Sequence, residues 1–265
     1  MDLHDVLKIL GNSRFMEIVL KSARSSIVET AVSKEQALLS SARSLSHGVL
    51  MTVKAFRKDG MKGIGKLVID NARAVVDNSR ESISDLLKDL RSDRQTFLKK
   101  VSKTLVFSIS ALLYAGGFDF EGGIPDSDLK LGIGYHRNIV SHTIIAPLFI
   151  EFSIRFILNI AKEMVEKGHE GHGGIWKILY DFRKEYSESL VGGLWLGAML
   201  HLLKDSAPLV GKTKPLVGIH GLSMEAHKRI LGLNSMLSGM FVWYTIKNGI
   251  RKKNENQTEN VEGKV

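Results

Sequence analysis

The chain contains no cysteine, which excludes disulfide bonds and any metal site built from thiolates. Proline is also scarce, and none of the four prolines precedes Pro125. Over residues 1–100, Leu, Ile and Val recur at spacings of three and four residues between charged side chains, as in Val6, Ile9 and Leu10. We therefore predict that residues 1–100 form amphipathic helices almost throughout.

A base-stacking surface is also missing from the sequence. The three Trp and five Tyr residues are not interleaved with Lys and Arg, as they are in proteins that stack on bases. The 37 basic and 28 acidic residues give a formal charge of +9, which suits nucleic acid and an anionic membrane surface equally well. Because no nucleic-acid-binding module is recognisable, we expect membrane lipid, and no nucleic acid, as a partner.

Glycines interrupt the helical pattern at residues 58–66, whose sequence is Lys-Asp-Gly-Met-Lys-Gly-Ile-Gly-Lys. The Gly-Ile-Gly-Lys part is superficially similar to a phosphate-binding loop. It lacks the full spacing, the Ser or Thr after the lysine and a preceding strand. We therefore predict a linker between helices rather than a nucleotide site.

Strongly apolar segments are crowded into the part of the chain after residue 103. Crossing a bilayer takes about 20 residues, so only the second segment is comfortably long and the fourth is borderline. Basic residues precede the first segment and follow the last, as expected for cytoplasmic flanks. The four segments are 104–118, 139–160, 190–203 and 230–246.

We predict an all-α fold with three regions. The first is a cytoplasmic amphipathic helical region at residues 1–100, the second a membrane-associated four-segment domain at 101–250, and the third a disordered polar tail at 251–265. This organisation predicts a multi-pass protein of a bacterial inner membrane with both termini in the cytoplasm. The alternative is a soluble helical bundle whose core helices are very apolar.

Side chains of the metal-ligand type gather in one short stretch beside the apolar segments. Asp126 and Asp128 follow Pro125 in a loop, and His136 and His142 come within the next 14 residues. Carboxylates and imidazoles are ligands that zinc, manganese and magnesium accept. A buried imidazole also needs a polar partner, which a metal or a carboxylate supplies. We therefore predict a divalent metal site here, with zinc or manganese bound. The alternative is an aspartate turn that caps the next helix.

A second group of polar residues lies on the third apolar segment. His201 and Asp205 are four residues apart, which puts both side chains on one face of a helix. They can supply further ligands, or they can form a hydrogen-bonded structural pair. Arg137 is a candidate for binding an anionic group. Glu151 and Arg155 have the same spacing inside the second segment, and we predict that they form a buried ion pair.

Taken in order, these motifs resemble those of the LexA-regulated, membrane-bound metal-dependent hydrolases of bacteria. Members of that family have a Pro-Asp-x-Asp loop after a short apolar helix, a His-Arg pair, a Thr/Ser-His pair and a Gly-x-x-x-His-Leu-Leu-x-Asp motif. The resemblance covers about residues 104–246, and Leu129 stands where the family often has a histidine, which leaves the number of metals open. The matching residues are 125–128, 136–137, 141–142 and 197–205, followed by Pro208 and Gly211.

The resemblance implies metal-assisted hydrolysis of an ester or phosphoester, with a lipid as the leading substrate class. A metal-activated water would attack the substrate. Asp205 would orient a ligand or act as general base, and Arg137 would stabilise the developing negative charge. The alternative is a membrane-anchored interaction or pore-forming effector in which the same residues form a structural network. The expected metal ligands are Asp126, Asp128, His136, His142 and His201.

Overall fold

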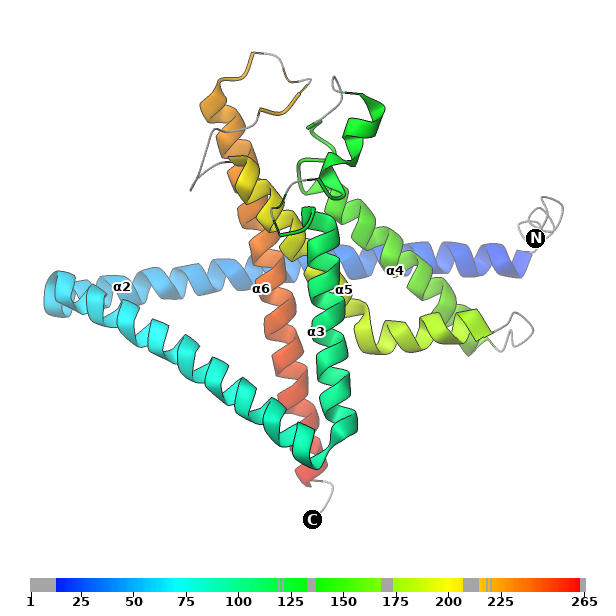
Figure 1. Cartoon of the computed structure of the whole chain (residues 1–265), viewed down its shortest axis with the longest axis horizontal. Helices are drawn as coiled ribbons and strands as arrows, with labels where there is room; N and C mark the ends of the chain where they lie inside the picture. The colour runs from blue at the N-terminus through cyan, green and yellow to red at the C-terminus, as the bar shows by residue number, and fades with distance from the viewer. Residues whose placement is uncertain are drawn as a thin grey trace. The chain divides into compact units, whose positions relative to one another are not determined.

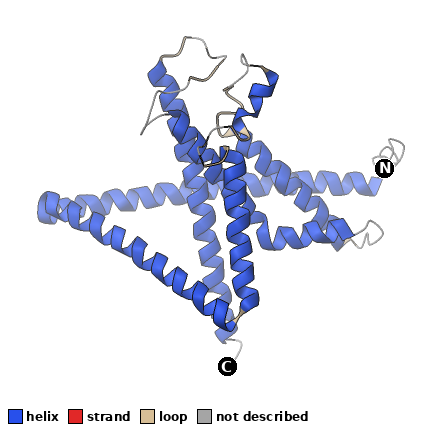
Figure 2. Cartoon of the chain, viewed as in Figure 1, coloured by secondary structure: helices blue, strands red, loops and turns tan. Residues whose placement is uncertain are grey.

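In the computed structural model the chain is helical, with no strand among the residues described, and the all-α prediction is confirmed (Figure 2). The structure describes residues 13–118, 120, 122–132, 137–167, 174–206, 215–217, 219 and 221–262. The elements are, in chain order, α2 (Ser13–Ser92), α3 (Arg94–Ala115), the 3-10 helix η1 (Pro125–Leu131), α4 (Ile145–Glu166), α5 (Gly174–Ser206) and α6 (Met224–Glu262) (Figure 1).

The chain divides into two compact units. The first unit comprises Met1–Ala37 and Val106–Val265, and the second comprises Leu38–Leu105. Both boundaries fall inside helices, so α2 and α3 each contribute to both units. All the described candidate metal ligands belong to the first unit. At its end, α6 continues as helix to Glu262, through most of the predicted polar tail, since that stretch contains no proline or glycine before Gly263.

A corner at Gly60 shapes the second unit. Gly60 has φ 61° and ψ −144°, a conformation that favours glycine, and the two arms of α2 meet there (Figure 1, cyan). A β-carbon on Gly63 would lie 2.2 Å from the carbonyl oxygen of Ala55, so the backbone approach at the corner also requires glycine. The loop predicted over residues 58–66 is therefore wrong except at Gly60, because one residue makes the turn and its neighbours stay helical.

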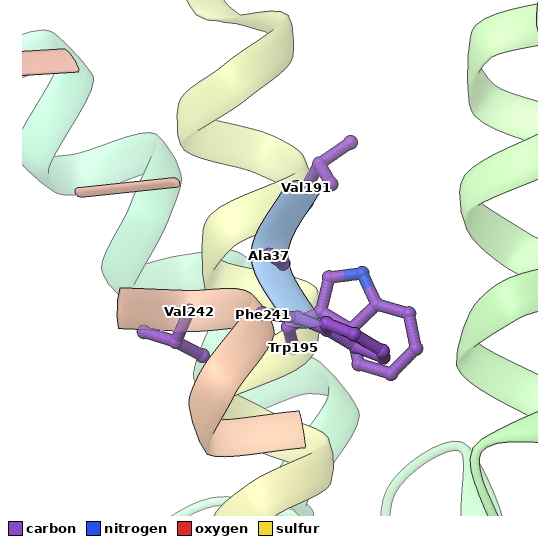
Figure 3. Close-up of a cluster of buried hydrophobic side chains, with 5 residues drawn as sticks. All are labelled: Ala37, Val191, Trp195, Phe241 and Val242. Atoms are coloured by element: carbon purple, nitrogen blue, oxygen red, sulfur yellow. The ribbon is translucent and has the colours of Figure 1, made fainter. Parts of the chain in front are cut away.

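The core of the first unit joins α2, α5 and α6. Its largest buried cluster consists of Ala37 from α2, Val191 and Trp195 from α5, and Phe241 and Val242 from α6 (Figure 3). The rings of Trp195 and Phe241 meet edge to face, with centroids 4.7 Å apart. This geometry is favourable for aromatic pairs, and it anchors α6 against α5.

Two glycines allow α3 and α5 to approach closely. A β-carbon on Gly193 would lie 2.1 Å from the carbonyl oxygen of Phe107, and one on Gly197 would lie 2.4 Å from that of Ala111. The hydroxyl of Ser110 also donates a hydrogen bond to a carbonyl of α5. Small residues spaced in this way let helix backbones touch. The contact brings the carboxyl end of α3, at Ala115, beside the later turns of α5.

A charged network is buried between α2, α4 and α5. Glu151 is fully buried and accepts hydrogen bonds from Arg155 Nε at 2.9 Å and from Trp195 Nε1 at 2.6 Å. Lys34 Nζ lies 2.7 Å from the same carboxylate. Burial lowers the pKa of Lys34, against the attraction of Glu151. The predicted ion pair between Glu151 and Arg155 is confirmed, with Lys34 as an additional cation.

Large apolar side chains lie on the outside of several helices in the first unit. Leu113 on α3 and Phe149 on α4 are two-thirds exposed, at 66% and 68%. Among the described residues, however, no helix is long and apolar enough to cross a bilayer. The prediction of membrane-spanning segments is therefore not supported. Within α4, which overlaps the longest predicted segment, charged residues such as Glu151 and Arg155 interrupt the apolar run.

Candidate metal centre

Three segments bring the candidate ligands together in the first unit. The 3-10 helix η1 carries Asp126 and Asp128, and the turn before α4 carries His142. Helix α5 carries His201 and Asp205, which lie one helical turn apart on a buried face. His142 precedes the start of α4 at Ile145 rather than lying inside the helix, because the backbone forms a turn in which His142 N–H donates to a carbonyl four residues earlier.

Asp126 is at the centre of this group. One oxygen of its carboxylate accepts a hydrogen bond from the backbone N–H of Gly122 at 2.7 Å. The other oxygen lies 3.1 Å from His142 Nε2 and 3.7 Å from His201 Nε2. Burial acts to raise the pKa of Asp126, but the hydrogen bond with His142, the electrostatic attraction of the His201 ring and the Gly122 N–H outweigh it. The pKa therefore lies well below its usual range, and the group is a carboxylate.

His142 is fully buried, and its ring is held from the Nδ1 side. The hydroxyl of Ser141 donates to Asp128 Oδ2 at 2.5 Å and lies 2.9 Å from His142 Nδ1. Since the hydroxyl proton is directed to Asp128, the hydroxyl oxygen accepts a proton from Nδ1 of the ring. We assign this proton from the hydrogen bonds. On the other side of the ring, Nε2 is hydrogen-bonded to Asp126, and a metal ion bound between them would take the place of the shared proton.

The ring of His201 is also held from its Nδ1 side, by a different group. Its Nδ1 donates to the carbonyl oxygen of Ala115 at 3.2 Å, at the end of α3. Its buried Nε2 makes no hydrogen bond with any residue that the structure describes. Burial lowers the pKa of His201, and Asp205 opposes this effect only in part. A neutral imidazole with a fixed Nδ1–H and an available Nε2 has the state required of a metal ligand.

Two of the distances among these atoms are close to those around a single metal ion. For metal–ligand bonds of about 2.0–2.2 Å, the ligand atoms of a tetrahedral site lie about 3.3–3.6 Å from each other. Asp126 Oδ1 lies 3.1 Å and 3.7 Å from the Nε2 atoms of His142 and His201. One donor atom from each of these three residues falls within 4.8 Å of the others. Asp126, His142 and His201 are therefore placed to hold a metal ion.

Asp205 lies beside this triad. Its Oδ2 is 3.6 Å from the Nε2 atoms of both His142 and His201, and its side chain is almost fully buried. Two imidazole nitrogens and two carboxylate oxygens therefore converge on one space. Acceptors repel each other at such distances unless a cation or protons lie between them, so the donor set fits a metal ion.

Arg137 marks the more accessible side of the group. Its Nε lies 3.9 Å from Asp205 Oδ2, and its side chain is partly exposed. Arg137 has φ 61°, unusual for a residue with a side chain, and its carbonyl accepts a hydrogen bond from Val217 N–H. Strained backbone of this kind often occurs at functional sites. The Asp126 carboxylate is also partly exposed, so water can reach the group.

The predicted site residues are therefore placed as follows. Asp126, His142, His201 and Asp205 come together, and Arg137 lies at their edge. Asp128 lies on the other side of the His142 ring, 3.6 Å from Nδ1, where it positions the ring through Ser141. His136 lies outside the described residues.

Sequence reasoning did not identify two supporting groups. Asn138 donates its side-chain amide to Asp128 at 3.0 Å, and its own oxygen accepts the backbone N–H groups of Val140 and Ser141. An asparagine two or three residues before such donors is typical of an Asx turn, which was the available signal. The second group, the Ala115 carbonyl, has no sequence signal because only the packing of α3 on α5 places it at His201.

A separate cavity of about 630 Å³ in the first unit shares no residue with the metal group. Both arginines of its lining are paired with carboxylates, Arg155 3.3 Å from Glu188 and Arg183 3.1 Å from Glu29. Lys184, which also lines the cavity, lies over the ring of Tyr180. Comparisons of the chain with models of protein families, with curated proteins and with solved structures found no match, so its family is not identified by them.

Proposed function

We propose that the protein is a metal-dependent hydrolase whose metal is held by Asp126, His142 and His201. The observation that carries the proposal is the convergence of two imidazole Nε2 atoms on the Asp126 carboxylate, 3.1 and 3.7 Å away. Two nitrogen donors and one oxygen donor make zinc the first choice and manganese the second. When bound, such an ion supplies a Lewis acid and lowers the pKa of a water ligand toward about 7.

The neighbouring residues support the hydrolytic role. Asp205 is close enough to accept the proton of a water molecule bound beside His142 and His201. Arg137 stands at the accessible edge, where its guanidinium can stabilise negative charge on an ester or phosphoester. Asp128 and Ser141 keep the His142 ring oriented. These roles agree with the resemblance of the motifs to the LexA-regulated, membrane-bound hydrolases.

A lipid or another amphiphilic ester is the proposed substrate class. The helices around the site carry exposed apolar side chains, including Ile109 and Leu113 on α3 and Phe149 on α4. An apolar outer surface suits a position in contact with lipid, and membrane association is part of the proposal. Arg137 would then meet a polar headgroup while the acyl chains contact the neighbouring apolar surface.

The proposal is tested first by metal content. We expect purified protein to carry about one zinc or manganese ion per chain, and His142→Ala and His201→Ala to lose it while their helical circular dichroism is retained. His47→Ala is the matched control, since His47 is an exposed histidine of the second unit. Wild-type protein that contains no metal, and takes up neither ion, would overturn the proposal.

A structural metal site is the second candidate function, favoured by the burial of His142 and His201. In that case Asp205 is a fourth ligand and closes the coordination sphere, whereas a catalytic site keeps one position open. Asp205→Asn separates the two. A catalytic base predicts retained metal with hydrolysis of phosphoester and carboxyl-ester substrates lowered about 100-fold or more. Loss of metal in this variant, with no hydrolysis by wild type, supports the structural site and a non-enzymatic effector.

A further inference from the structure

One face of the second unit is apolar and exposed. Between Leu38 and Asp59 on α2, large apolar residues recur at intervals of seven, four, four and three, which places them on one side of the helix. Three of them are well exposed, with Leu45 59%, Val49 64% and Phe56 53% accessible. The apolar face consists of Leu38, Leu45, Val49, Val53 and Phe56.

The opposite side of this helical arm is basic. Arg43, His47, Lys54 and Lys58 follow each other at intervals of four, seven and four residues, and all are exposed. Between Glu35 and Asp59 the chain has no acidic residue, and in the structure none of these basic side chains forms an ion pair with a described residue. The second arm differs, because Arg73 and Arg80 there alternate with Asp70 and Asp77.

We propose that this arm of α2 lies on an anionic lipid surface, with its apolar face inserted and its basic face toward the headgroups. A helix with an apolar stripe opposite Lys and Arg is typical of peripheral membrane binding. Charge complementarity selects a lipid surface over a second copy of the chain, because a second copy would bring another basic face. The proposal concerns the second unit and does not depend on the metal centre.

The absence of cysteine allows a direct test with single fluorescent labels in the full-length chain. Labels at Val49→Cys and Phe56→Cys are expected to shift to shorter wavelength on addition of phosphatidylcholine vesicles that contain phosphatidylglycerol. A label at His47→Cys, on the opposite side, is the control and is expected to stay unshifted. Pure phosphatidylcholine vesicles are expected to give little shift at any of the three positions.

Four results would overturn the proposal. They are no shift at either apolar position, an equal shift at His47→Cys, an equal shift with neutral vesicles, and a shift without vesicles that grows with protein concentration. The last result would identify a second copy of the chain as the occupant. An equal shift at His47→Cys would mean that the whole circumference of the helix is enclosed, as in a complex with another protein.

The charge contribution has its own test. Each basic residue near an anionic surface contributes a factor of about five to binding, so R43Q/K54Q/K58Q is expected to weaken binding to phosphatidylglycerol-containing vesicles about 100-fold. The matched control R73Q/R80Q/K88Q removes the same charge from the second arm and is expected to change binding only a few-fold. Equal losses in both variants would contradict a specific basic face. Metal content should be unchanged in both, which keeps this test separate from that of the hydrolase.

Discussion

Two buried polar clusters of the first unit differ in how their donors and acceptors are matched. In the first, the Glu151 carboxylate faces three donors, from Lys34, Arg155 and Trp195. In the second, the Asp126 carboxylate faces two imidazole nitrogens, of which only His142 Nε2 lies within hydrogen-bonding distance. The first cluster is complete with protein atoms alone, whereas the second becomes favourable only when a cation or protons enter it.

The difference shows how a structural network can be distinguished from a binding site by hydrogen-bond counting. Both clusters are buried, both contain carboxylates, and both include residues four apart on a helix. Burial and composition alone therefore do not separate them. Their hydrogen bonds do separate them. Among the ring and amine nitrogens of the two clusters, only His201 Nε2 lacks a hydrogen-bond partner in the described part of the chain.

The largest effect is expected from removing the carboxylate of the first cluster, Glu151. Glu151→Ala leaves Lys34 and Arg155 buried without their shared anion, which should lower the free energy of unfolding by about 3–5 kcal/mol. Urea denaturation in the presence of a chelator measures this effect without any metal contribution. Glu29→Ala, at the partly exposed edge of the same network, is the control and should cost less than about 1 kcal/mol. Equal costs would contradict the matched arrangement.

A smaller effect is expected from binding a metal ion in the second cluster, at Asp126, His142 and His201. Metal at about 100 times its dissociation constant should stabilise the wild type by about 2.7 kcal/mol relative to protein in chelator. His201→Ala should show no such gain, since it removes one of the three donors. His47→Ala should behave like the wild type. Thermal unfolding with and without zinc measures the difference, and an equal gain in His201→Ala would place the metal elsewhere.

The local parts of this arrangement were predictable from the sequence, and the long-range parts were not. The spacing of His201 and Asp205 gives one helix face, and the absence of proline before Pro125 gives long helices. The corner at Gly60 was read as a longer loop because several glycines cluster there, although one suffices for the turn. Asp126 and Asp128 lie on opposite sides of the His142 ring. This arrangement depends on how η1 packs against the turn that carries His142, and the spacing of the residues in the sequence does not predict it.

The apolar segments illustrate the same limit. Their composition indicated membrane spans, yet Glu151 and Arg155 lie within the longest of them, and only the structure shows that α2 supplies Lys34 to this pair. Residues far apart in the chain thus complete a charged network. In a hydropathy profile, the members of this network on α4 only interrupt the apolar segment. The sequence predicted the pair but not its third member, since a lysine on a distant helix carries no local signal.

The smallest effect is expected in the dependence of stability on pH. Burial lowers the pKa of His201 below about 6.5, its value in the unfolded chain, so the folded ring binds a proton less tightly than the unfolded one. Metal-free protein should therefore lose stability as the pH falls below about 6.5, until the pH reaches the folded pKa. Urea midpoints in chelator, measured for wild type and His201→Gln from neutral pH downward, test this expectation.

The variant should show a shallower slope than the wild type in that window, because it lacks the ring that must take up the proton. Asp126 acts in a different window: its lowered pKa favours the folded state above about 3.8, and this contribution is lost only as the pH falls below that value. The contributions of His201 and Asp126 to the stability of the folded state can thus be separated by pH. If stability falls with the same slope in wild type and His201→Gln above about pH 5, another group controls the acid sensitivity. The assignment of His201 as a neutral ring able to bind a metal would then be wrong.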